Sequence, residues 1–131
     1  MEGFKIYDFN SISNFINPRP GEFKFGEKVL FVKGMEELKN SKAQYVLFGI
    51  PEDIGVRANS GKPGTALAWK ACLKALLNTQ ANQYTNPPNV ILLGEVDCRT
   101  AMEKSANFGE DDPNYNAKLG DLVKGIDEVV Q

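Results

Sequence analysis

A polar loop whose side chains are capable of chemistry follows an apolar run that ends at Gly49. The candidate substrate-binding residues of this loop, at 51–64, are Glu52, Asp53, Arg57, Asn59 and Lys62. Arginine offers a planar fork and lysine a point charge, so the loop could bind a substrate carboxylate. The two adjacent carboxylates suggest acid–base chemistry or a metal, although adjacent side chains tend to point apart and two carboxylates alone make a weak metal site. The alternative is a solvated loop whose polar groups hydrogen-bond its own backbone.

A second candidate set follows the next apolar run, where Glu95, Asp97 and Cys98 are close in sequence. We expect only one of the two carboxylates to face the same rim as the 51–64 loop, and a structural or solvated role is the simpler interpretation of both. Cys98 or Lys62 as a nucleophile is a weaker hypothesis, because the chain has no histidine to serve as a base. Both cysteines, Cys72 and Cys98, are interpreted as reduced packing residues of a cytosolic protein.

The composition excludes several classes of function. The 131 residues contain no histidine, which rules out a Ser-His-Asp triad, a Cys-His pair and any imidazole-bearing metal site. The 15 basic and 17 acidic residues give a net charge of −2, so nothing attracts the chain to nucleic acid or to an anionic membrane. No apolar run approaches the roughly 20 residues of a membrane span, and the N-terminus lacks the pattern of a signal peptide. A cytoplasmic location is expected.

Apolar runs and amphipathic segments predict an α/β fold with a parallel sheet. The predicted strands at 43–50 and 90–94 each contain a continuous apolar run, Tyr45–Phe48 in the first, which is typical of strands buried on both faces. Residues 65–78, with Thr65 as a possible cap, predict a helix solvated only along a narrow strip, and 115–130 predict another. Strand, helix and strand in this order form a βαβ unit, so the polar segments after the two strands should share one rim.

The region before the first confident strand is predicted to be an N-terminal arm, and the chain is divided into an arm at 1–42 and a βαβα portion at 43–131. Residues 1–26 have no regular pattern but are rich in large apolar side chains, so we expect them to pack on the domain or on a neighbouring subunit. A short strand is expected at 27–32 and one or two helical turns at 35–41. Residues 100–113 show no clear pattern, and another strand would be the next element after the last helix.

A resemblance to the ureohydrolase family (arginase, agmatinase and formimidoylglutamase) is carried by residues 46–69, V-L-F-G-I-P-E-D-I-G-V-R-A-N-S-G-K-P-G-T-A-L-A-W. That family begins with a strand ending in G-x-P, a loop with G-V and G-x-x-G, and a helix. The sequence is most similar to the formimidoylglutamase-like or arginase-like branch because it continues with L-L-N-T-Q-A-N at 76–82 and I-L-L-G-E-V-D-C at 91–98. The resemblance covers roughly residues 44–130.

The resemblance implies a partial three-layer α/β/α sandwich of the arginase-like type and hydrolysis of a guanidino or formimino C–N bond. In the family a pair of manganese ions activates a bridging water. The metal ligands lie in motifs resembling G-G-G-H, D-A-H-x-D and D-x-D, none of which occurs here. We therefore expect the N-terminal portion of such an enzyme, inactive by itself, with no catalytic residue or metal ligand of its own.

In a complete enzyme, the five polar residues of the 51–64 loop would lie near the mouth of a site for an amidine or guanidine substrate. The helix at 65–78 has more apolar surface than so short a chain can cover, which indicates that it belongs either to an oligomer or to a longer protein, and a homo-oligomer is expected. The same excess supports an alternative of another class, a non-catalytic α/β module that acts through self-association or a protein partner.

Overall fold

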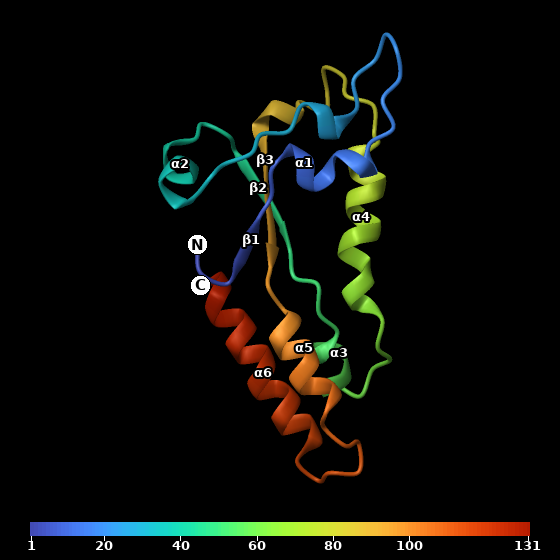
Figure 1. The fold of residues 1–131 in the computed structure, drawn as a ribbon, viewed down its shortest axis with the longest axis vertical. Coiled ribbons are helices and arrows are strands. Elements are labelled where there is room, and N and C mark those ends of the chain that lie inside the picture. The colour runs from blue at the N-terminus through green and yellow to red at the C-terminus, as the bar shows by residue number, and fades with distance from the viewer.

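The computed structural model describes residues 1–131 as a set of helices around a small sheet (Figure 1). The strands are β1 (Phe4–Ile6), β2 (Tyr45–Gly49) and β3 (Val90–Val96). The α-helices are α1 (Phe9–Ile12), α2 (Met35–Asn40), α3 (Ile54–Ala58), α4 (Ala68–Leu77), α5 (Arg99–Ala106) and α6 (Tyr115–Val130). Short 3-10 turns cover Ser13–Phe15, Phe25–Glu27, Thr65–Leu67 and Pro87–Asn89. None of the helices has both the length and the apolar character needed to cross a membrane.

The sheet has the strand order β1-β3-β2, so its central strand is the last one in the chain. β2 and β3 run parallel, whereas β1 runs antiparallel to β3. The predicted α/β class is confirmed, but the sheet is mixed rather than parallel throughout. The prediction that residues 1–26 are irregular is wrong at β1 and α1, because elements of three and four residues are too short for a hydrophobic period to show.

A bulge in β3 adapts the central strand to its neighbours. Leu47 of β2 pairs with Leu92, but the next residue, Phe48, pairs with Gly94, so β3 contains one extra residue. Gly94 has a φ of +138°, and a Cβ at this position would lie 2.0 Å from the carbonyl oxygen of Lys5. Both observations require glycine where β1 approaches β3.

The two faces of the sheet bury different sets of side chains. Leu47 and Leu92 pack in a cluster that includes buried residues of α1 and α4. Phe48 and Val96 pack in another cluster, with buried residues of α3 and α6. Because successive residues of a strand point to opposite faces, α4 and α6 cover opposite faces of the sheet, and Figure 1 shows them on either side of the strands.

β2 is an edge strand and is less buried than the sequence predicts. Tyr45 and Val46 leave 62% and 44% of their surface exposed, because neither side chain packs against a core cluster, whereas Leu47 and Phe48 of the same strand do. By contrast, β3 continues two residues beyond the predicted strand, to Val96, and is buried along most of its length. Burial on both faces is therefore correct for the central strand and wrong for the first half of β2.

α4 begins later and is more exposed than the sequence predicts. The predicted helix at 65–78 opens with a 3-10 turn and becomes α-helical only at Ala68. Gly64 is the N-cap of that turn, and the hydroxyl of Thr65 donates instead to the carbonyl oxygen of Glu52 at 3.2 Å. The buried residues of α4 are Leu73 and Leu77. Most of its other residues are exposed or half-buried, so the solvated strip is not narrow.

Other predicted elements show where sequence patterns succeed and fail. α2 and α6 lie where helices are expected, at 35–41 and 115–130. Residues 27–32 do not form a strand: Leu30 alone makes an isolated bridge, with Ile91, just after the 3-10 turn at 25–27. The expected loop at 51–64 contains α3, and the unassigned 100–113 contains most of α5. Both helices are shorter than the 10 to 12 residues over which helical periodicity becomes reliable.

Candidate functional site

The Asp53–Arg57 pair is largely buried and ties several segments together. Oδ1 of Asp53 accepts a hydrogen bond from Nε of Arg57 at 3.1 Å, and Oδ2 accepts one from the amide of Gly64 at 3.0 Å. Nη2 of Arg57 donates to Oγ of Ser105 in α5 at 2.5 Å. That hydroxyl donates in turn to the carbonyl oxygen of Met102 at 2.7 Å. Arg57 would have to exchange these partners to bind a substrate carboxylate, so the geometry favours a structural role for the pair.

The other predicted loop residues differ in whether their side chains form hydrogen bonds or ion pairs. Oε2 of Glu52 accepts from the amide of Gly55 at 2.8 Å, so Glu52 and Asp53 have separate hydrogen-bond partners. Nδ2 of Asn59 donates to the carbonyl oxygen of Gly55 at 3.3 Å. Lys62 is exposed and forms no ion pair. Lys62 is therefore the charged group of this loop that can meet a ligand without breaking an existing contact.

A cavity of about 520 Å³ lies at the carboxyl end of β3. Its lining includes Lys5, Pro51, Glu95, Asp97, Cys98 and Arg99. Pro51 comes from the segment after β2, so the ends of the two parallel strands do share one rim. Glu95 and Asp97 both line the cavity, and the prediction that only one of them faces the rim is wrong, because residues i and i+2 of a strand point to the same side. None of the five predicted loop residues lines this cavity.

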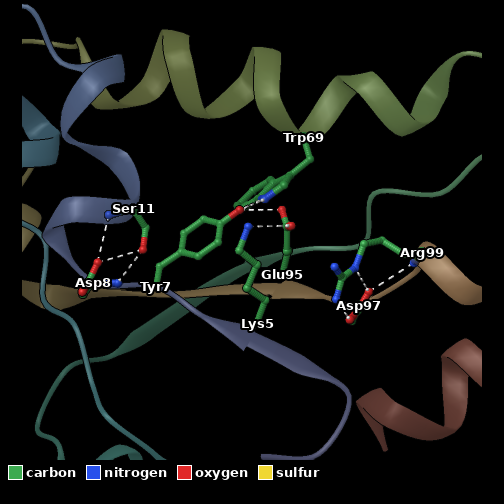
Figure 2. Close-up of polar contacts among 8 residues, drawn as sticks. All are labelled: Lys5, Tyr7, Asp8, Ser11, Trp69, Glu95, Asp97 and Arg99. Carbon is green, nitrogen blue, oxygen red and sulfur yellow. Dashed lines mark hydrogen bonds and ion pairs between the residues drawn. The ribbon is translucent and has the colours of Figure 1, made fainter.

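A chain of hydrogen bonds connects α4 to this cavity through Tyr7 (Figure 2). Nε1 of Trp69 donates to Oη of Tyr7 at 3.3 Å, and the hydroxyl of Tyr7 donates to Oε2 of Glu95 at 2.5 Å. Lys5 is opposite Glu95 in the β1–β3 register, with its Nζ 3.8 Å from Oε1. Burial, followed by the hydrogen bond to Glu95, raises the pKa of Tyr7 above its ordinary value. Tyr7 therefore remains a proton donor at neutral pH.

Asp97 and Arg99 form an exposed ion pair at the same rim (Figure 2). Nε of Arg99 donates to Oδ1 of Asp97 at 2.9 Å, and Nη2 donates to Oδ2 at 2.6 Å. The amide of Arg99 also donates to Oδ1 at 3.2 Å. These hydrogen bonds, with the charge of the guanidinium, lower the pKa of Asp97 to about 2. Asp97 is therefore ionised at neutral pH and is a poor general acid.

Cys98 lines the cavity but is a poor nucleophile. Its side chain is buried, and burial raises the pKa of the thiol to about 11, with further contributions from the charges of Glu52, Asp97 and Glu95. The reactive form of cysteine is the thiolate, which such a thiol hardly populates at neutral pH. The geometry therefore disfavours the nucleophile hypothesis for Cys98.

The rim does not fit a pair of manganese ions. No group of three His, Cys, Asp or Glu side chains is placed to hold a metal ion. Glu52, Asp53, Glu95 and Asp97 each accept hydrogen bonds from protein donors. Carboxylates engaged in this way, without a histidine, do not form the ligand set that a binuclear hydrolase requires.

Comparison with protein-family models, with curated proteins and with solved structures finds no match to this chain. The resemblance to ureohydrolases therefore rests on the amino-acid sequence of residues 46–69 and their neighbours. It enters below as a proposal.

Sequence reasoning missed the contribution of Lys5, Tyr7 and Trp69 to the site. Tyr7 and Glu95 are 88 residues apart, so no local spacing indicates their contact. One local signal was available: the side chains of Asp8 and Ser11 form a capping box at the start of α1. An Asp followed three residues later by a polar partner is a known helix start, and it would have placed Tyr7 directly before a helix.

Proposed function

We propose that this chain forms the N-terminal portion of a manganese-dependent ureohydrolase, of the formimidoylglutamase or arginase type, which hydrolyses a guanidino or formimino C–N bond. The observation that carries the proposal is the amino-acid sequence of residues 46–69, which resembles the start of the sequences of that family. This stretch runs from β2 through the polar loop into α4, and β2 and β3 are parallel neighbours. That strand–loop–helix–strand order is the one the resemblance requires.

In this proposal, residues 44–130 supply the scaffold of an arginase-like three-layer sandwich and the rim at the ends of its strands. α4 and α6, which pack on opposite faces of the sheet, would belong to its two outer layers. Lys62 and Asn59, both exposed, would lie at the mouth of the site, near the charged end of an amidine or guanidine substrate. The Asp53–Arg57 pair would hold this loop against α5 without touching the substrate.

The manganese ions of the proposed enzyme are not held by this chain. Its sequence lacks histidine, and the rim carboxylates have other partners. The metal ligands would therefore be supplied by polypeptide other than residues 1–131, and we assign no catalytic step to the residues of this chain. Alone, the chain is expected to be inactive.

The coding DNA beyond the codon for Gln131 provides the first test. The proposal expects it to continue into an apolar strand followed by a G-G-G-H motif, and an immediate stop codon would contradict it. A second test incubates the purified chain with Mn²⁺ and with arginine, agmatine or formiminoglutamate. No turnover is expected, and hydrolysis of any of these substrates would overturn the claim that the chain alone is inactive.

A second candidate function is a non-catalytic module that acts through self-association or a protein partner. The open edge of β2 favours it, since Tyr45, Val46 and the following Ile50 are exposed and no charged residue or proline blocks the strand itself. Natural proteins usually protect such edges, because they pair readily with other strands. Sedimentation would test this function: a monomer that retains no partner would count against it, and a dimer together with an immediate stop codon would favour it over the enzyme.

A further inference from the structure

A second cavity, of about 280 Å³, lies beside α4, between that helix and the N-terminal segment. Its lining includes Lys5, Tyr7, Phe15, Trp69, Lys70 and Glu95. The volume is just below the roughly 300–1,000 Å³ of sites for drug-sized ligands, so the cavity suits a smaller molecule. None of the five predicted loop residues contributes to it, and it is therefore separate from the loop of the proposed enzyme.

The aromatic walls of this cavity are held in place by the fold. Phe15 and Trp69 pack against the core cluster of α1 and α4. The ring of Trp69 also lies directly against the backbone of Gly49, and its Nε1 donates to Tyr7. Walls that are fixed before binding lower the entropic penalty of association. They favour a ligand with a flat or compact apolar body.

The charged groups around this cavity leave an excess of positive charge. Glu95 accepts a hydrogen bond from Tyr7 and lies 3.8 Å from Nζ of Lys5, so its charge is already compensated. Lys70 forms no ion pair. Its Nζ lies 6.0 Å from the centre of the Phe15 ring. An unpaired ammonium beside an aromatic wall is complementary to an anion that carries an apolar group.

We propose that this cavity binds a small organic carboxylate, with its apolar body against Phe15 and Trp69 and its carboxylate on the ammonium group of Lys70. Lys5 is paired with Glu95, so the net positive charge of the cavity comes from Lys70. A single carboxylate matches Lys70, the one lysine lining this cavity that has no acidic partner. The proposal does not depend on the hydrolase, since it uses neither the 51–64 loop nor any metal.

The intrinsic fluorescence of Trp69 provides a direct test, because it is the only tryptophan of the chain and lines the cavity. Phenylacetate serves as the probe, and phenylacetamide is the neutral control of the same shape. We expect a saturable change with phenylacetate in the millimolar range and a response at least about tenfold weaker with the amide, which lacks the charge. Excitation at the red edge of the tryptophan band avoids absorption by either compound.

Two lysines on α4 give a matched pair of variants. Lys70→Gln should weaken phenylacetate binding about tenfold, as expected for loss of one charge-assisted hydrogen bond. Lys74→Gln, one turn further along and outside this cavity, should leave binding unchanged. Both residues are exposed, so both variants should keep the parent circular-dichroism spectrum. The proposal is overturned by the absence of saturation, by equal responses to acid and amide, or by equal losses in the two variants. No outcome involves turnover, so failure here leaves the hydrolase proposal standing.

Discussion

Replacing Gly49 by alanine should destabilise the protein through a clash with Trp69. A Cβ at position 49 would lie 2.2 Å from Cδ2 of the indole and 2.4 Å from both Cε2 and Cγ. Real Cβ contacts are essentially never shorter than 3.0 Å, so either the ring or the end of β2 has to move. The indole is a rigid group whose three nearest atoms belong to the ring system, and no rotation of a flexible chain end can relieve the contact.

The expected loss of stability follows from two contributions. Overpacking of a well-packed contact costs about 1–3 kcal/mol, and displacement of the ring also removes the hydrogen bond from Trp69 to Tyr7, about 1 kcal/mol. Gly49→Ala should therefore lower the free energy of unfolding by about 2–4 kcal/mol, a large part of the roughly 5–15 kcal/mol of a typical domain. Urea unfolding, followed by circular dichroism and by Trp69 fluorescence, measures this difference.

Gly120 provides the control because it lies inside α6 and a Cβ there would meet nothing within 4 Å. Gly120→Ala should stabilise the protein by about 0.5–1 kcal/mol, through the higher helix propensity of alanine. In a Trp69→Ala background the three clashing ring atoms are gone, so adding Gly49→Ala should cost less than about 1 kcal/mol, a clear coupling between the two positions. If the free energy of unfolding of the single variant Gly49→Ala lies within about 0.5 kcal/mol of the parent value, the predicted clash is refuted.

Three further predictions concern the rim. Asp53→Ala should lower the free energy of unfolding by about 2–4 kcal/mol in a urea titration, because it leaves the largely buried guanidinium of Arg57 without its carboxylate. Lys62→Ala, at an exposed site, should change the free energy of unfolding by less than about 0.5 kcal/mol. Equal effects of the two substitutions would contradict the structural role of Asp53. Under native conditions a disulfide reagent at pH 8 should modify the exposed Cys72 quickly and Cys98 slowly, because burial raises the pKa of Cys98 to about 11; two equally fast thiols would disprove this. Because the pKa of Asp97 is lowered to about 2 from its ordinary value of 3.8, its ion pair stabilises the protein above that ordinary pKa and is lost as the pH falls towards 2. Replacing Asp97 by Asn should therefore reduce the loss of stability between pH 4 and 2, and an unchanged acid profile would contradict the assignment.

How much of the fold the sequence predicts depends on the length of each element. α6, with 16 residues and one apolar stripe, is predicted with its bounds unchanged. β1, with three residues, is not predicted at all, because its place in the sheet is decided by pairing with β3 rather than by its own residues. β2 is predicted as a strand but with the wrong burial, since an apolar sequence cannot show which of its residues other elements cover.

The candidate site shows the same limit in its chemistry. The sequence predicts that the ends of β2 and β3 share one rim, and Pro51 and Asp97 do line one cavity. It cannot predict that Arg57 is already bound by Asp53 and Ser105, because Ser105 is 48 residues away on a helix too short to recognise. The identity of a polar residue thus indicates what chemistry is available, whereas its partners decide whether that chemistry is free to act.

The position of β3 at the centre of the sheet has a consequence for synthesis of the chain on the ribosome. Both of its neighbours, β1 and β2, precede it in the sequence, so neither can pair in the native way until residues 90–96 have left the exit tunnel. Until then the apolar strand β2 has both of its edges open, a condition that promotes aggregation of partly made chains. Contacts between residues so far apart in sequence also slow folding after release. The nascent chain should therefore depend on chaperones that hold apolar segments while the residues between β2 and the end of β3 are being made.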